Sequence, residues 1–174
     1  MFQLKPYWLR IFVLWHMVIA SCSLLAQDCR DDVPASTPTN RFINHDNGTV
    51  SDKQTGLMWK QCIERLSGSD CTASDGYPLE MEWIKAMQHA NTTVYAGYDD
   101  WRIPNIKELQ SIVEYKCKRL ALNLAVFPDD RTHRILWSST PITNSDAFVV
   151  DSAGMVFNKS KGFPVYMRLV RGGQ

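Results

Sequence analysis

Two stretches of the chain carry apolar residues at the spacing of a helix that is buried on one side. Residues 80–91 form the first stretch, and its apolar positions fall at i, i+3, i+4 and i+7. These positions are Trp83, Ala86, Met87 and Ala90. The sequence therefore predicts an amphipathic helix over residues 80–91, with these four side chains facing inward.

The second predicted helix has a start signal as well as an apolar face. Pro104 disfavours a helical conformation for the residue before it, and Asn105 is a residue type that caps helix N-termini. Glu108 follows three residues later, as a capping box requires. The helix is predicted to continue to Cys117. Its apolar face is formed by Ile106, Leu109, Ile112 and Val113.

Short apolar or alternating segments on both sides of the helices indicate strands. Before the helices, with turns at Asn47-Gly48 and Thr55-Gly56, these are residues 41–44, 49–53 and 57–62. After the helices they are residues 135–140, 147–151, 155–159 and 165–171. Two helices between two groups of strands predict an α+β domain in which the terminal strands pair and close the domain.

The N-terminus is predicted to be an export signal. Residues 1–10 carry two basic residues and no acid, and the apolar run that follows is too short for a stable transmembrane helix. Cleavage after Ala26 would remove a signal peptide of residues 1–26. A lipobox at residues 19–22 would instead remove residues 1–21 and leave Cys22 as the lipidated first residue. We favour lipidation of Cys22, because both the position and the four residues of the lipobox fit.

Both processing routes remove Cys22 from disulfide pairing, by cleavage or by lipidation, and leave four cysteines to pair, an even number that suits disulfides in an oxidising compartment. Cys62 and Cys71 flank a short Gly/Ser-rich loop, so we pair them with each other. Cys29 is then left to pair with Cys117. A metal site is not predicted, because the chain has no CxxC or HxxxH spacing.

Residues 27–40 include a Pro-, Ser- and Thr-rich stretch and are predicted to form a linker arm before the folded domain of residues 41–174. Near the start of this domain, residues 46–52 offer the oxygens of Asp46, Asn47 and Asp52, which is partly typical of a calcium loop. The spacing is irregular and the distal glutamate is missing, so a hairpin is the preferred interpretation.

The charge balance excludes a generally basic nucleic-acid-binding protein. The formal net charge is +1, and without residues 1–26 there are 17 basic and 18 acidic residues. The distribution is uneven, because residues 27–110 carry 8 basic and 13 acidic residues whereas residues 111–174 carry 9 and 5. The second half could therefore present a face to anions.

Five blocks of sequence, in their order, resemble one bacterial family. They are TGLMWKQC at 55–62, MEWIKAMQHA at 81–90, AGYDDWRIPNIKELQSIV at 96–113, WSST at 137–140 and RLVRGGQ at 168–174. They are similar to the Lcl C-terminal domain family, which is named after the terminal domain of a collagen-like adhesin. The resemblance covers about residues 41–174.

This resemblance implies a C-type lectin-like fold with two helices against a small antiparallel sheet, braced by disulfides. It also implies an exported surface or envelope protein, located in the periplasm, on the outer membrane or outside the cell. For the named adhesin it implies attachment to acidic polysaccharide. No collagen-like repeat precedes the domain in this sequence, so trimeric adhesion is not expected to carry over.

Catalysis is not expected. The broad fold class includes formylglycine-generating enzymes, which depend on reactive cysteines, whereas the four mature cysteines here are assigned to disulfides. The chain has no GxSxG or HExxH motif, and no cofactor is predicted. The calcium-binding triplets of C-type lectins are also absent. Stacking of a sugar on tryptophan is not expected, because four tryptophans are predicted to lie in the core: Trp59, Trp83, Trp101 and Trp137.

We therefore expect an envelope or surface binding module that recognises acidic polysaccharide without calcium. The alternative is a structural protein that contacts another envelope protein and binds no small ligand. The main ligand-binding candidates are Lys116, Lys118, Arg119, Arg131 and Arg134. His133, Lys159 and Lys161 are further candidates in the same half of the chain.

Overall fold

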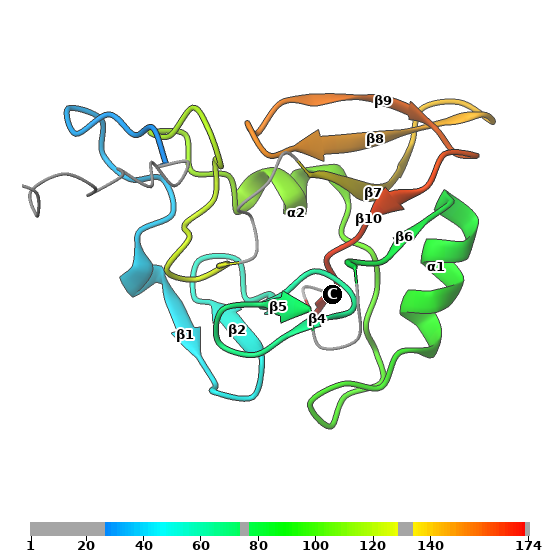
Figure 1. Ribbon diagram of the computed structural model, residues 1–174, viewed down its shortest axis with the longest axis horizontal. Coiled ribbons are helices and arrows are strands. Elements are labelled where there is room, and N and C mark those ends of the chain that lie inside the picture. The colour runs from blue at the N-terminus through cyan, green and yellow to red at the C-terminus, as the bar shows by residue number, and fades with distance from the viewer. Residues whose placement is uncertain (1–26, 74–76, 129–133, 173–174) are drawn as a thin grey trace, which may run out of the picture.

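The computed structural model describes residues 27–73, 77–128 and 134–172 (Figure 1). One sheet joins the two ends of the domain. In spatial order its strands are β1 (Phe42–Asn44), β2 (Thr49–Asp52), β3 (Met58–Lys60) and β11 (Val170–Arg171), all antiparallel. Val170 lies opposite Trp59. The last strand thus pairs with the N-terminal strands, as predicted.

A second, five-stranded sheet is built mainly from the C-terminal half. In spatial order its strands are β6 (Glu80–Met81), β10 (Val165–Tyr166), β7 (Ile135–Pro141), β8 (Asp146–Asp151) and β9 (Val156–Ser160). Its pairs are antiparallel except for β10 with β7, which run parallel.

The smaller elements complete the described secondary structure. A 3-10 helix (Thr39–Arg41) precedes β1, and a two-stranded sheet forms from β4 (Leu66–Ser67) and β5 (Thr72–Ala73). The expectation of one small antiparallel sheet was therefore too simple. The described residues form an α+β domain with strands divided among separate sheets, because the chain changes sheet between β10 and β11.

Both helices are shorter than predicted. The first, α1 (Trp83–Thr92), begins later because Glu80–Met81 extends as strand β6 beside β10. The second, α2 (Ile106–Ser111), ends well before Cys117, because the chain after it forms isolated bridges to other segments. Figure 1 shows α2 next to the layer of β7, β8 and β9, with α1 to one side beyond β6.

The predicted start of α2 is confirmed. The Asn105 side chain accepts a hydrogen bond of 3.0 Å from the Glu108 amide, and Glu108 Oε2 accepts one of 2.7 Å from the Asn105 amide. Arg102 donates to both oxygens of the Glu108 carboxylate, at 2.8 and 2.6 Å. The capping box is therefore fixed to the preceding extended segment by an ion pair.

The apolar residues form two buried clusters. One lies between the first sheet and α2 and includes Trp59 and Phe127, while the other lies under α1 and the second sheet and includes Trp101 and Trp137. These three tryptophans are buried, as predicted. Trp83 is only partly buried, which corrects the expectation for it, because its indole lies at the edge of α1 and donates to the Ser138 carbonyl.

The C-terminal segment departs from the single alternating strand that the sequence predicts. It contributes β10 to one sheet and β11 to the other, and the link between them is buried. Arg168 in this link is 1% exposed, its guanidinium lies 4.7 Å from the centre of the Phe127 ring, and it donates to the Lys60 and Gln61 carbonyls. Alternation fails here because both sides of the segment face protein.

Replacement of the cap residue should weaken the fold. Asn105→Ala removes the acceptor for the Glu108 amide, so the free energy of unfolding should fall by about 1 kcal/mol. Urea denaturation measures this change. Asn158→Ala on β9 is the control, because Asn158 is exposed outside any helix cap. Equal stability of the two variants would contradict the capping role.

Candidate functional site

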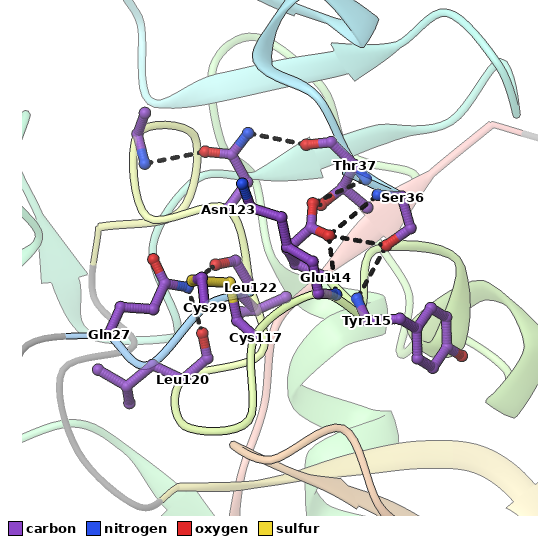
Figure 2. Close-up of a disulfide and its surroundings, with 12 residues drawn as sticks. Gln27, Cys29, Ser36, Thr37, Glu114, Tyr115, Cys117, Leu120, Leu122 and Asn123 are labelled. Carbon is purple, nitrogen blue, oxygen red and sulfur yellow. Dashed lines mark hydrogen bonds between the residues drawn. A yellow bond between two sulfur atoms is a disulfide. The ribbon is translucent and has the colours of Figure 1, made fainter. Parts of the chain in front are cut away.

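The basic candidates at residues 116–119 lie on a loop that is fixed by the N-terminal segment (Figure 2). Cys29 is disulfide-bonded to Cys117 across 88 residues, and backbone hydrogen bonds join Arg30 to Lys116 and Lys118 to Asp28. Gln27 donates from Nε2 to the Leu120 and Leu122 carbonyls, at 2.6 and 2.7 Å. Residues 27–40, expected as a linker arm, are thus packed along the domain.

Glu114, which precedes the loop in the sequence, binds the same N-terminal segment at Ser36 and Thr37 (Figure 2). One oxygen accepts from the Ser36 amide and hydroxyl and the Lys116 amide, and the other accepts from the Thr37 amide and hydroxyl, all within 3.2 Å. Burial alone would raise the pKa of Glu114, but these hydrogen bonds outweigh burial and lower it. These hydrogen bonds occupy both oxygens of the Glu114 carboxylate, so the group is not available to bind a ligand.

Three of the predicted cations occupy this loop. Lys118 and Arg119 are exposed and Lys116 is half-buried. Within the described residues none of the three side chains has an acidic partner, since the ion pairs found there involve other cations. Lys116 also lines a depression of about 350 Å³ beside the disulfide. The loop therefore presents three positive charges on a covalently fixed backbone.

The other basic candidates are placed differently. Arg134 lies 5.6 Å from the centre of the Tyr166 ring and borders a small cavity with Ala121 and Leu122, just beyond the basic loop. Arg131 and His133 lie outside the described residues. Lys159 lies 4.7 Å from the Phe163 ring, and Lys161 lies over Trp83 and donates to the Thr143 carbonyl, so they belong to another part of the surface.

A buried charge cluster was not anticipated from the sequence. Glu64 accepts from Lys60 at 2.5 Å and forms a 2.8 Å contact with His89, while Lys60 Nζ lies 4.1 Å from the centre of the Tyr95 ring. Burial acts to raise the pKa of Glu64, but its hydrogen bond with His89 and the Lys60 charge lower it overall. His89 comes from α1, 25 residues from Glu64, and no motif links them.

Beside this cluster lies an open polar pocket of about 450 Å³. Its walls come from the β1–β2 turn, the loop closed by the Cys62–Cys71 disulfide, and Tyr95. The lining residues are Asn44, Asp46, Asn47, Gly48, Gln61, Gly68, Ser69, Tyr95 and Ala125. The sequence indicated the β1–β2 turn and the disulfide loop separately, but nothing in it places them together.

The oxygens of the alternative calcium loop do not converge. Both carboxylate oxygens of Asp52 accept hydrogen bonds from Arg41, and Asp52 also accepts from Thr55 and the Gln54 amide. Asn47 uses its side-chain oxygen to accept from Thr49. Among the residues described, no group of three His, Cys, Asp or Glu side chains is arranged to hold a metal ion. This segment instead forms the turn and second strand of the hairpin of β1 and β2, in line with the preferred interpretation.

Comparison with known families identifies the domain. The model of the Lcl C-terminal domain matches residues 48–171, which is most of the chain. The chain belongs to the Lcl C-terminal domain family. Membership indicates a surface or adhesin-related module, and the two disulfides of this Lcl domain are compatible with export. No curated protein matches the chain. None of the helices in the described residues is long and apolar enough to cross a membrane.

The two disulfides should differ in their effect on the stability of this Lcl domain. In the chain-entropy model the Cys29–Cys117 link, which closes a much longer loop, contributes about 4–5 kcal/mol, against less than about 3 kcal/mol for Cys62–Cys71. Paired Cys→Ser variants of each link, compared by urea denaturation, measure the difference. A larger loss for the Cys62–Cys71 variant would contradict this order.

The Glu64 cluster should make stability fall in acid. Because the folded-state pKa of Glu64 lies below its ordinary value of 4.5, its contribution is present above that value and is lost as the pH falls through the folded pKa. Glu64→Gln should therefore be less stable than the wild type at pH 7, and the gap should narrow below pH 4.5. Urea denaturation from pH 7 to pH 3 measures it, and a gap independent of pH would contradict the ionic role.

Proposed function

We propose that this protein is a non-catalytic binding module of the bacterial envelope or cell surface that engages acidic polysaccharide without calcium. The observation that carries the proposal is the loop with Lys116, Lys118 and Arg119. Its cations lack acidic partners among the described residues, and its backbone is tied to the N-terminal segment by the Cys29–Cys117 disulfide. Cations on a fixed backbone attract sulfate or carboxylate groups without the cost of ordering the loop itself.

The rest of the proposed ligand-binding face comes from the chain that follows. Arg134 borders the cavity that Ala121 and Leu122 also line, which supports placing it at the edge of the same face. Arg131 is included on sequence grounds alone. A long polymer would bridge these positions, because repeated anionic groups can contact several separate cations at once.

The proposal also includes a C-type lectin-like fold. Two helices, strands from both ends of the domain paired in one sheet and two disulfides support this assignment. Glycan binding here would not use the calcium site of that fold, because Asn105, which follows Pro104, is engaged as the helix cap. Export with lipidation at Cys22 remains part of the proposal, and mass spectrometry of the mature N-terminus would test it.

Charge reversal tests whether the basic loop with Lys116, Lys118 and Arg119 binds the polysaccharide. Wild-type protein should be retained on a heparin column in the presence of a calcium chelator and be released by salt, because salt screens exposed charges. Lys118→Glu combined with Arg119→Glu should abolish retention without changing the unfolding midpoint, since both side chains are exposed.

The matched control reverses two exposed lysines on other elements, Lys53→Glu with Lys85→Glu, and gives the same change in net charge. This control should keep most of the retention. Equal loss in both double variants would show a general charge effect and reject the loop as the site. Retention that requires calcium would reject the proposed mode of binding.

A further inference from the structure

The polar pocket beside Tyr95 has a chemistry opposite to that of the basic loop. No Lys or Arg is among its lining residues, and its one charged group is the Asp46 carboxylate. Its volume of about 450 Å³ is within the range of small-molecule sites, which run from about 300 to 1,000 Å³. An anionic ligand would meet Asp46 without a lining cation to offset the repulsion, so the lining favours a neutral polar molecule.

The β1–β2 turn presents hydrogen-bond donors to this pocket in fixed orientations. Asn44 Oδ1 accepts from the Asp46 amide at 3.0 Å, and Asn47 Oδ1 accepts from the Thr49 amide and hydroxyl at 3.1 and 2.7 Å. Because both side-chain oxygens are engaged, each asparagine has its NH₂ group left to donate. These donors are held in place before any ligand arrives, which lowers the entropy lost on binding.

Gln61 supplies an acceptor at the buried side of the pocket. It is 7% exposed, and its Nε2 donates to the Val126 carbonyl at 3.1 Å, which fixes the orientation of the amide. Its Oε1 has no hydrogen-bond partner among the described residues. This oxygen is not fully enclosed by protein, so water or a ligand in the pocket can donate a hydrogen bond to it.

Tyr95 and Gly48 form a tight contact at the pocket wall. A Cβ at Gly48 would lie 1.9 Å from the Tyr95 hydroxyl oxygen, so only glycine allows the ring to approach the turn, and its φ of +82° also favours glycine. Burial and the Glu64 carboxylate raise the pKa of Tyr95, so its hydroxyl keeps its proton and can donate. Neither the Tyr95 hydroxyl nor the Ser69 hydroxyl has a hydrogen-bond partner among the described residues, so both can bond to a ligand.

We infer that this pocket binds a neutral saccharide unit through its hydroxyl groups. Each sugar hydroxyl both donates and accepts, and the pocket offers both functions: the Asn44 and Asn47 NH₂ groups donate, Asp46 and Gln61 accept, and the Ser69 and Tyr95 hydroxyls do either. The site is separate from the basic loop, so it does not depend on the proposed acidic-polysaccharide function.

NMR titration of the exported, disulfide-bonded protein tests this inference. The probes are glucose, galactose, mannose and N-acetylglucosamine, with glucuronate and inorganic sulfate as anionic comparisons at equal concentration. At least one neutral sugar should shift the amide signals of Gly48, Gln61 and Ser69 saturably, and the anions should not. The absence of saturable shifts at these amides with every neutral sugar would overturn the inference.

A matched pair of tryptophan variants tests the location. Ala125 lines the pocket and Ala153 does not, yet both are exposed and both donate their amide to the side chain two residues earlier, Asn123 and Asp151 respectively. Ala125→Trp should weaken sugar binding at least about tenfold, equivalent to about 1.4 kcal/mol, whereas Ala153→Trp should leave it unchanged. Equal effects of the two variants would place binding elsewhere and overturn the proposal.

The variant Asp46→Asn tests whether the pocket binds a sugar or a cation. Asp46 has a φ of 54°, a left-handed conformation that asparagine also adopts, so the turn should be preserved. The variant keeps an acceptor oxygen and should bind the sugar with affinity close to that of the wild type. Loss of the shifts in Asp46→Asn, or on addition of a chelator, would indicate a metal-dependent site and overturn the inference. Lys118→Glu with Arg119→Glu should leave sugar binding intact.

Discussion

The buried guanidinium of Arg168 links the two sheets at the point where the chain passes from one to the other. The segment that carries it leaves the second sheet after β10 and enters the first as β11, so this residue stands where the sheets meet. Its hydrogen bonds to the Lys60 and Gln61 carbonyls hold the end of β3, and the Phe127 ring packs against its charge. A buried charge is tolerated only where such partners replace water. Each of the two residues whose carbonyls Arg168 holds belongs to a further site. Lys60 pairs with Glu64 in the buried charge cluster, and Gln61 lines the polar pocket.

Local rules were sufficient where a feature depends on neighbours in the sequence. The capping box of Asn105 and Glu108 and the turn at Asn47-Gly48 follow from residue type and spacing, and the structure contains both. Local rules failed where distant segments decide the outcome. Strand β6 displaces the expected start of α1, since pairing with β10 uses its backbone. The periodicity of Ile112 and Val113 continues beyond α2, but the bridge between Val113 and Leu122 ends the helix.

The same distinction applies to the two candidate sites. The basic loop could be predicted because Lys116, Lys118 and Arg119 are almost contiguous and flank Cys117, a cysteine whose partner could be assigned. The polar pocket could not, because it joins the β1–β2 turn, the disulfide loop and Tyr95, which are brought together only by the complete fold. His89 likewise reaches Glu64 through the position of α1. Only the tertiary structure reveals sites of this kind.

If the chain is exported as proposed, the long disulfide also constrains how it matures. In a chain that crosses a membrane from its N-terminus, Cys29 emerges first and is followed by Cys62 and Cys71, all before Cys117, the partner of Cys29 in the structure. Early oxidation can then join Cys29 to the wrong thiol, and thiol–disulfide exchange must reverse that error. The loop with Lys118 and Arg119 is closed only when this exchange ends. The formation of the basic surface is thereby coupled to the oxidising and isomerising capacity of the compartment in which the chain folds.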